Sequence, residues 1–511
     1  MFQRFMCYVI NSFCCLLYVK EYKRFINSRN INEIQRNKLL DILEKNKCCE
    51  YGKKYDFKSI KSINEYQNRV PVTCYEDYID YIEKIKNGER NILTGEDILL
   101  LELTSGSVSA SKLIPYTSSL KEEFQKGLKP WIYSLYSGYR GVKWGKSYWS
   151  ITPATTQNEY TKGGIPIGFE EDSEYFGKLD KKLFDVIFAV SKDVAKEKDM
   201  EVFYYKTALS LLKCKNLSFI SVWNPTFLIL LLDYMEKNRK SLGEDISKKD
   251  RKRGSEVSEF LSKKQYAKLW RHLKVISCWC DANAKEYASK VKMLFPDVDI
   301  QPKGLLATEG LISFPFPGEN GARISINSHF FEFSSIVNNE VYLTHQLEQG
   351  RQYSVIITTS GGLYRYRLND IIEVTGFSGK LPLIRFVGKQ DKVSDLFGEK
   401  LNESFVKNII ESLEIKPEFY MVAPETDRYV LYIKSDRVPE DIDRFLRENF
   451  HYDYCRKLGQ LKRLKIFRLT GNPEKEYLDE CVKRGQRLGD IKPSVLQLKG
   501  GWDKAFKGEY L

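Results

Sequence analysis

The sequence predicts an α/β protein with a large N-terminal α/β domain and a smaller C-terminal α+β domain. Three observations predict this class. A chain of 511 residues is too long to fold around one compact core. Apolar strand-like runs alternate with helix-like runs from residue 98 onward, and short β-like runs follow one another after residue 329. We place the N-terminal domain at residues 1–388, with a β-rich subdomain at about 329–388, and the C-terminal domain at 393–511.

The individual elements follow from composition and periodicity. Residues 32–90 look helical, with breaks at Gly52 and Pro71, and Ile98–Leu103 has the composition of a buried strand. Because strands and helices then alternate, we expect a mostly parallel sheet in this domain. Further helices are expected at 118–136, 227–238, 255–268 and 282–294, and strands at 148–152, 219–222, 274–279, 304–308, 330–333, 341–344, 353–359, 363–368 and 371–375.

The segment Phe5–Val19 is apolar and resembles the hydrophobic part of a signal peptide. It is too short to span a bilayer, and Asn11 and Ser12 interrupt it. We therefore expect a helix that docks on the protein, without stable insertion into a membrane. A role at a membrane surface stays open.

Charge and cysteine usage limit the class of protein. The net charge of +13 suits anionic substrates, but the charges are interleaved, and the dense basic run 237–253 is expected to be a solvated helix and loop surface. The odd, scattered set of eleven cysteines predicts reduced thiols and a cytoplasmic protein. The four histidines show no metal-ligand spacing, and no nucleic-acid-binding module is recognisable.

Four short motifs carry residues suited to chemistry. A loop rich in Ser, Thr and Gly runs from Thr104 to Lys112 after the first strand, where its backbone N–H groups can face a polyphosphate. Thr308 and Glu309 end another predicted strand, where an acid can hold a metal bound to phosphate. Asp370 lies between two predicted strands and can accept hydrogen bonds from a ribose. Lys492 stands in the segment Gly489–Pro493. Taken singly, each also fits an ordinary turn or a solvated side chain.

In this order and spacing, the motifs resemble the adenylate-forming superfamily. Within it, the chain resembles the auxin-responsive Gretchen Hagen family of acyl acid amido synthetases, including its bacterial members. The resemblance covers nearly the whole chain. It rests on Val70–Val72, Tyr75–Tyr78, Thr104–Ser107, Lys112–Thr117, Gly163–Phe169, Ser221–Leu228, Ile276–Trp279, Lys303–Gly310, Phe330–Phe333, Leu363–Arg367, Gly398–Leu401 and His451–Gln460.

The resemblance implies ATP and Mg²⁺ as cofactors and a reaction in two halves. A carboxylate attacks the α-phosphorus of ATP, and an amine, first of all an amino acid, then takes the acyl group and releases AMP. Thr308 and Glu309 would face the α-phosphate, with Glu309 also on the metal, and Lys492 would be the catalytic lysine of a mobile C-terminal domain. A hinge would lie at 389–392. Nucleotide contacts would come from Thr104, Ser105, Gly106, Ser107, Lys112, Ala307, Tyr364, Asp370, Lys389 and Asp391.

The chain departs from the family pattern at a few of these positions. Lys389 stands where an arginine usually binds the ribose, and Ser109 stands where a second glycine is usual. Asn369 replaces a glycine before Asp370, although asparagine can adopt the same left-handed conformation.

Two other functions stay open on the sequence. The acyl group could pass to a thiol, such as coenzyme A or a carrier protein, or the chain could be a catalytically weak homologue that binds a small acid. We expect a monomer whose partners are a small carboxylic acid and an amino acid or other amine, with no nucleic acid.

Overall fold

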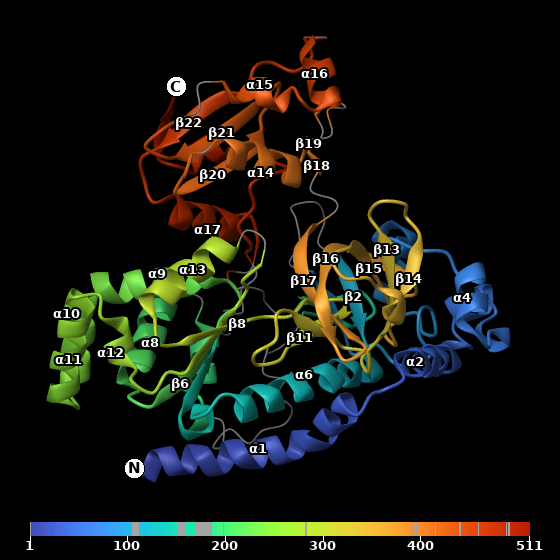
Figure 1. Cartoon of the computed structure of the whole chain (residues 1–511), viewed down its shortest axis with the longest axis horizontal. Coiled ribbons are helices and arrows are strands. Elements are labelled where there is room, and N and C mark those ends of the chain that lie inside the picture. The colour runs from blue at the N-terminus through green and yellow to red at the C-terminus, as the bar shows by residue number, and fades with distance from the viewer. Residues whose placement is uncertain are drawn as a thin grey trace. The chain divides into compact units, whose positions relative to one another are not determined.

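The computed structural model describes residues 2–104, 112–150, 159–168, 186–197, 199–281, 284–389, 393–394, 396–397, 399, 401–413, 415–438, 441–457, 459–486, 488 and 491–511. It consists of two compact units (Figure 1). One unit runs to Val387 and the other begins at Gly388, next to the segment 389–392 for which the family resemblance suggests a hinge.

A four-stranded sheet in the order β3-β6-β7-β8 is parallel throughout, as the alternation of strands and helices predicted. Strands β6 and β7 are buried at every position, which is typical of strands covered on both faces. Strand β8 was not predicted from the sequence, because it is largely polar and has a single buried position. The strands are β3 (Lys146–Trp149), β6 (Leu217–Ser221), β7 (Val275–Cys278) and β8 (Asp299–Pro302).

Helices accompany this sheet, and two details differ from the sequence prediction. The helix expected at 255–268 is two helices, because Lys264 adopts a left-handed φ of 52° between them. Arg253, expected on a solvated surface, is buried, and its guanidinium donates to the carbonyl oxygens of Leu212 (2.8 Å) and Leu269 (2.9 Å). The helices are α8 (Met200–Lys213), α9 (Pro225–Lys237), α10 (Arg239–Ser247), α11 (Arg251–Ser262), α12 (Tyr266–Leu269) and α13 (Lys285–Leu294).

The N-terminal part is helical, as predicted, and its helical run is interrupted near Pro71, between α4 and η2. Gly52, however, lies inside a helix. A Cβ at this position would come within 2.1 Å of the Asn46 carbonyl oxygen, so the glycine permits close packing and does not end a helix. The elements are α1 (Phe2–Ile26), α2 (Ile31–Asn46), α3 (Glu50–Lys54), η1 (Phe57–Ser59), α4 (Ile63–Arg69), η2 (Tyr75–Tyr78), α5 (Ile79–Lys86), α6 (Ser118–Gly138), η3 (Val142–Trp144) and η5 (Lys192–Lys196).

A seven-stranded sheet in the order β11-β12-β17-β16-β15-β13-β14 forms the β-rich subdomain. It begins at Ser313, earlier than the sequence suggested. The two strands expected at 363–368 and 371–375 are one strand, β16, with a bulge opposite Ser354 and Ile356. The elements are β11 (Ser313–Pro315), β12 (Ala322–Ile324), β13 (Phe330–Ser335), β14 (Val341–Leu343), η7 (Thr344–Gln346), β15 (Gln352–Thr358), β16 (Tyr366–Ser378) and β17 (Leu381–Lys389).

Two smaller sheets complete the first unit. One has the order β2-β1-β5-β4, and the other is the hairpin of β9 and β10. The β1–β2 connection carries Thr104 and Lys112, and the β9–β10 turn carries Thr308 and Glu309. The strands are β1 (Leu100–Leu103), β2 (Leu113–Tyr116), β4 (Glu159–Tyr160), β5 (Pro166–Ile167), β9 (Leu306–Ala307) and β10 (Gly310–Leu311).

A buried polar cluster ties α2, α6, β15 and β13 together. The Glu123 carboxylate lies 2.6 Å from the Lys38 ammonium and accepts hydrogen bonds from His329 Nδ1 (3.0 Å) and the Ser360 backbone N–H (3.1 Å). His329 Nε2 accepts from the Leu311 N–H (3.1 Å), which assigns the ring proton to Nδ1 and leaves the imidazole neutral. Burial lowers the pKa of His329, in agreement with this assignment.

The second unit is the α+β structure that the sequence predicted. Its four-stranded sheet has the order β20-β21-β22-β23, and a short pair joins β18 and β19. The elements are β18 (Val393–Ser394), β19 (Leu401–Asn402), α14 (Glu403–Ser412), β20 (Phe419–Pro424), β21 (Tyr429–Lys434), α15 (Ile442–Leu446), α16 (Phe450–Lys457), β22 (Lys465–Leu469), α17 (Pro473–Lys483), η9 (Trp502–Lys504) and β23 (Gly508–Tyr510).

Candidate active site

The expected phosphate loop connects two antiparallel strands, β1 and β2. Its described ends, Thr104 and Lys112, are joined because the Thr104 N–H donates to the Lys112 carbonyl oxygen (2.9 Å), one residue beyond the pair Leu103 and Leu113. The loop therefore leaves the sheet from a closed base. The other predicted members, Ser105, Gly106 and Ser107, lie outside the described residues.

Tyr75 holds the Lys112 end of this loop. Its hydroxyl accepts a hydrogen bond from the Leu113 N–H (2.8 Å), and the Lys112 ammonium lies 5.4 Å from the centroid of its ring. The neighbouring Glu76 has a lowered pKa, first because its own backbone N–H hydrogen-bonds it, then because of Cys74 and the Lys112 charge. These contacts keep Lys112 beside the loop.

Thr308 and Glu309 form the two-residue turn of the β9–β10 hairpin, in which Ala307 pairs with Gly310. The prediction that a buried strand over 304–308 ends at these residues is therefore wrong, because the strand here is the short, half-buried β9. The chain leaves the parallel sheet after β8 and turns at Gly304, where a Cβ would lie 1.9 Å from the Ser313 carbonyl oxygen. Ala307, Thr308 and Glu309 are half-buried, as a turn at the edge of a site requires.

Two tyrosines connect this turn with the phosphate-loop strands. The Tyr116 hydroxyl on β2 donates to the Thr308 carbonyl oxygen (2.6 Å). The pKa of Tyr366 is raised, mainly by burial and next by the negative charge of Glu309, with smaller effects from Glu76 and Tyr75. The contact that joins the two motifs is the Tyr116 hydrogen bond, which ties the Thr308 turn to β2, the strand that follows Lys112.

Asp370 lies on β16, four residues beyond Tyr366, and it is buried. The sequence placed it at a turn between two strands, but the position is the bulge within β16. Asn369 adopts the left-handed conformation with φ of 61°, as expected for the residue that replaces glycine there. The bulge sets the direction of the Asp370 backbone without ending the strand.

Tyr364 does not offer a surface to a nucleotide. Its side chain is fully buried, its hydroxyl donates to the Leu93 carbonyl oxygen (2.6 Å), and its ring stacks on Tyr51 with centroids 4.7 Å apart. The sequence could not distinguish this tyrosine from Tyr366, because both stand in the same run of alternating Tyr and Arg. The side chain of Tyr364 is a core group.

Lys389 and Lys492 belong to the second unit. Lys389 is exposed at the end of β17, and the expected hinge residue Asp391 lies outside the described residues. The Lys492 side chain is also exposed, while its neighbours Ile491 and Ser494 are buried. Its carbonyl oxygen accepts from the Tyr477 hydroxyl (3.2 Å). The backbone at Lys492 is therefore fixed, while its side chain lies at the surface.

Lys303 is a buried lysine whose role the sequence did not reveal. Its ammonium donates to Ser221 Oγ (2.8 Å) and lies 4.6, 5.1 and 5.8 Å from the ring centroids of Trp223, Trp131 and Trp149. Burial lowers the pKa of Lys303 to about 7. In a lysine-rich chain, a lone lysine is expected to be exposed, and the tryptophans that surround it come from three distant segments.

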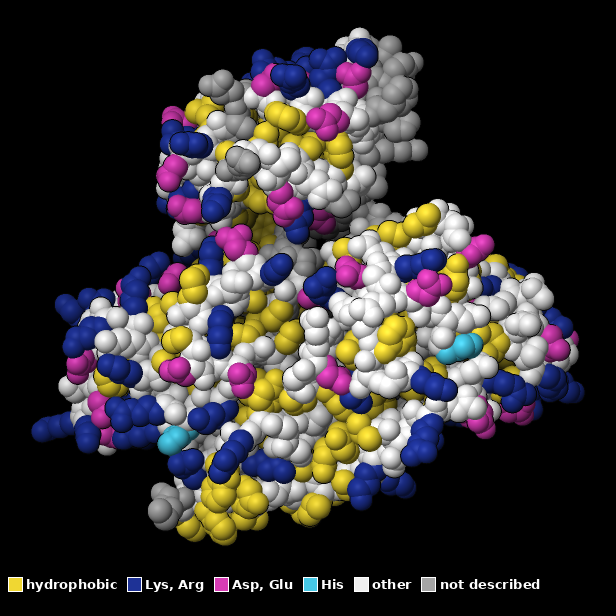
Figure 2. Space-filling view, viewed as in Figure 1, with side chains coloured by type: hydrophobic (Ala, Val, Ile, Leu, Met, Phe, Trp, Pro, Cys, Tyr) yellow, Lys and Arg dark blue, Asp and Glu magenta, His cyan; other side chains and the backbone are white. Residues whose placement is uncertain are grey.

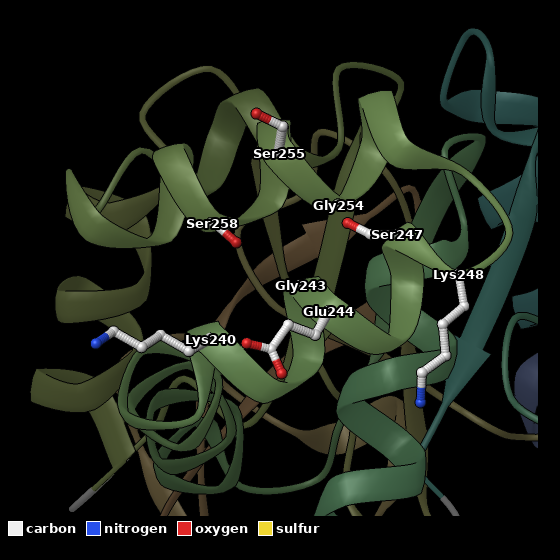
Figure 3. A pocket seen from close by; sticks show the side chains of 8 residues that line it. All are labelled: Lys240, Gly243, Glu244, Ser247, Lys248, Gly254, Ser255 and Ser258. Atoms are coloured by element: carbon white, nitrogen blue, oxygen red, sulfur yellow. The ribbon is translucent and has the colours of Figure 1, made fainter.

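A shallow pocket of about 450 Å³ lies between α10 and α11 (Figure 3). Its lining residues come from these two helices and from Lys248, which directly follows α10, and none belongs to the predicted motifs. Its side chains include Lys240, Glu244 and Lys248, of which Figure 3 shows the first two beside each other at one end. This pocket is therefore separate from the candidate active site.

The donor set suits a metal that takes most of its ligands from phosphate and water. In the described part of the chain, no group of three or more His, Cys, Asp and Glu side chains could hold a metal ion. A single carboxylate beside a phosphate loop is a usual arrangement for Mg²⁺. Glu309 fits that role, because it stands on the turn that β2 holds through Tyr116.

An enzyme that forms acyl adenylates requires a phosphate loop, an acid near it and a lysine on a separate C-terminal unit. Lys112 at the end of the expected loop, Glu309 on the turn joined to β2 and Lys492 in the second unit are compatible with this plan, so the chain has the architecture of an adenylate-forming ligase. More narrowly, it belongs to the GH3 family: the model of the GH3 family N-terminal domain matches residues 23–300, and that of the GH3 family central domain matches residues 323–389.

Relatives and solved structures agree with this assignment. The chain is 24% identical to indole-3-acetic acid-amido synthetase GH3.4 of Arabidopsis thaliana, over 75% of this chain and 71% of that protein. It is 20% identical to GH3.17 of the same plant, over 92% of each. Its fold is similar to that of AtGH3.15 acyl acid amido synthetase in complex with 2,4-DB, with a TM-score of 0.77, 19% identity, and coverage of 97% of this chain and 95% of that one. The chain is accordingly an acid–amino acid ligase.

Proposed function

We propose that this enzyme uses ATP to adenylate a small, largely apolar carboxylic acid and transfers the acyl group to the amino group of an amino acid. A carboxylate oxygen bonds to the α-phosphorus as the bond to the β-phosphate breaks, and pyrophosphate leaves. The amine nitrogen then bonds to the acyl carbon, the acyl–oxygen bond breaks, AMP leaves and the amine loses a proton. The single observation that supports the proposal is the Tyr116–Thr308 hydrogen bond, which joins the turn that carries Glu309 to β2, the strand next to Lys112.

In the first half-reaction, the chain must bind a polyphosphate and offset the charge that grows on its α-phosphate. Backbone N–H groups of the loop that begins at Thr104 and the Lys112 ammonium supply donors to phosphate. Mg²⁺, when bound, neutralises phosphate charge, and Glu309 would hold it. We assign Thr308 to the α-phosphate and Asp370 to the ribose.

The C-terminal unit would supply the remaining groups. We propose that the exposed Lys492 ammonium approaches the α-phosphate during adenylation, and that Lys389 contacts the ribose as a single charge where the family uses a planar guanidinium. Rotation about 389–392 would exchange the environments of the two half-reactions. The hydrogen bond from the Tyr477 hydroxyl to the Lys492 carbonyl oxygen supports this role, because a fixed backbone places the ammonium accurately.

The tryptophan cluster around Lys303 supports an apolar acyl site. Trp131 comes from the helix that follows the phosphate-loop strands, and Trp223 follows β6 of the parallel sheet. We place the acyl group between these two elements. Large flat side chains favour flat, apolar acids.

An ATP–pyrophosphate exchange screen over a panel of carboxylic acids tests the proposal. At least one apolar acid should stimulate exchange, and Lys492→Ala should lower the rate at least about 100-fold with little change in ATP affinity. Lys475→Ala, which removes an exposed lysine from the same unit, is the matched control. If no acid stimulates exchange but acids still bind, the chain is the catalytically weak homologue that binds a small acid. If exchange survives Lys492→Ala, the assignment of the catalytic lysine is wrong.

The acceptor is tested in a second assay. With the best acid, the acyl adenylate should be discharged by an amino acid and not by coenzyme A or a carrier-protein thiol, as seen from the AMP released and the mass of the product. Faster discharge by a thiol would replace the amide-forming function with thioester formation.

We also propose that the enzyme works as a monomer in a reducing, cytoplasmic environment. All eleven cysteines are free thiols, and burial raises the pKa of Cys15 and Cys214 to about 11, which keeps these two unreactive. Light scattering measures the mass in solution. Titration of accessible thiols in cell extracts, before and after reduction, tests the redox state.

A further inference from the structure

Helix α1 presents a long apolar stripe to the solvent. The side chains of Phe2, Phe13 and Leu16 are 77%, 55% and 67% exposed, and Figure 2 shows hydrophobic side chains gathered along the lower edge of the molecule, where Figure 1 places α1. Phe5, Val9, Phe13 and Leu16 follow one another at steps of three or four residues, which puts them on one face of the helix. The exposed apolar residues of this stripe are Phe2, Phe5, Tyr8, Val9, Phe13, Leu16 and Leu17.

The opposite face of α1 is fixed to the protein. The Asn11 side-chain amide donates to the carbonyl oxygens of Lys143 (2.9 Å) and Gly145 (3.3 Å). Near the other end, Phe25 packs on Phe314 with ring centroids 4.8 Å apart. The helix also lies along α6 (Figure 1). Its position therefore belongs to the fold, and it cannot be withdrawn without breaking buried contacts.

The exposed charges of α1 are positive. From Phe2 to Lys20 the helix has no Asp or Glu, and the apolar stripe ends at the exposed cations Lys20, Lys23 and Arg24, with the half-buried Glu21 between them. An apolar face that ends in lysine and arginine is the pattern of helices that lie in the interface of an anionic bilayer. Aromatic side chains favour the same depth, and Trp144, exposed beside Tyr8 at a ring distance of 4.2 Å, extends the stripe.

We propose that α1 docks this enzyme on the surface of an anionic lipid bilayer, with the helix parallel to the membrane plane and the stripe from Phe2 to Leu17 inserted among the lipids. Such a patch is larger than scattered apolar residues on a soluble surface would make. By length and composition alone, α1 is also long and apolar enough to span a membrane, and it is unique in this among the helices of the described residues. The fixed inner face favours the parallel arrangement. A helix that spanned the membrane would lose the hydrogen bond of Asn11 to Lys143 and the packing of Phe25 on Phe314.

Flotation of the full chain with lipid vesicles tests this inference. The chain should float with vesicles of phosphatidylcholine and phosphatidylserine, and more weakly with phosphatidylcholine alone or at high salt. The variant F5Q/F13Q/L16Q/L17Q should lose at least about tenfold in bound fraction on both vesicles. The matched control M293Q/V337Q replaces side chains that are 72% and 90% exposed elsewhere, and it should bind like the wild type.

A second variant separates charge from apolar insertion. K20Q/K23Q/R24Q should lose most of the preference for phosphatidylserine while it keeps weak binding to phosphatidylcholine. ATP–pyrophosphate exchange without vesicles should be unchanged in all variants, which also shows that they fold. The inference is overturned if the wild type floats with neither vesicle or if F5Q/F13Q/L16Q/L17Q floats normally. It is also overturned if that variant converts a dimer to a monomer in light scattering, or if only detergent, and not high salt with alkaline carbonate, removes the bound chain.

Discussion

Glu123→Gln should destabilise the first unit by about 3–5 kcal/mol, the usual cost of breaking a buried ion pair. Glu123 is 1% exposed and the side chain of its partner Lys38 is 8% exposed, so water cannot replace the lost charge. The glutamine side chain can still accept a hydrogen bond from Ser360. The Lys38 ammonium, however, would remain buried without the counterion that now lies 2.6 Å away.

The pKa of Glu123 gives an independent estimate of the same energy. Burial alone would raise this pKa, but the Lys38 charge and the hydrogen bond from His329 outweigh it and lower the pKa from 4.5 to about 2. At about 1.36 kcal/mol per tenfold change in proton affinity, that difference is about 3.4 kcal/mol. Because the folded pKa is lower, this stability is present above pH 4.5 and is lost as the pH falls toward 2.

Urea unfolding followed by tryptophan fluorescence measures the loss, since six of the seven tryptophans lie in the first unit. The double variant Glu123→Gln/Lys38→Met removes the stranded charge and should recover about half of the lost free energy or more. Wild-type stability should fall between pH 4.5 and 2 by more than that of Glu123→Gln. A single variant within about 0.5 kcal/mol of the wild type would refute the reasoning, because that is the range of an ordinary surface substitution.

Three further changes have defined outcomes. Tyr116→Phe removes the hydroxyl that donates to the Thr308 carbonyl oxygen at 2.6 Å. It should lower the free energy of unfolding in urea by about 1–3 kcal/mol and slow ATP–pyrophosphate exchange. Unchanged exchange would show that the hairpin turn does not need this hydrogen bond. The pKa of Lys303 is about 7 in the folded chain and 10.5 in the unfolded chain, so between these values only the unfolded chain binds the proton. The free energy of unfolding should therefore rise by about 3 kcal/mol from pH 6.5 to 9.5. Lys303→Met should abolish that rise, and a rise that persists in this variant would contradict the assignment. Asn369→Ala should cost about 1–2 kcal/mol and weaken ATP binding by displacing Asp370, while Asn369→Gly should be neutral, and equal behaviour of the two variants would exclude backbone strain as the cause.

Local features of this protein were determined by its sequence. Helix α6 begins at Ser118, as predicted, because Thr117 provides an N-cap whose side chain accepts from the Leu120 N–H. The parallel sheet followed from alternating elements, and the left-handed Asn369 followed from the residue type. The motifs Thr104–Lys112 and Thr308–Glu309 were recognisable because their order and spacing along the chain can be read directly from the sequence.

Only the tertiary structure decided which charges are buried and which segments meet. Glu123 and His329 are 206 positions apart, and Lys303 acquires its tryptophan neighbours from three separate segments, so no window of sequence contains either environment. The same holds for Gly52, whose close neighbour is a carbonyl of another helix, and for the apolar stripe of α1. The physical reason is that burial is a property of the surfaces that two segments share. A single segment specifies its own periodicity, but its partner decides which side chains lose contact with water.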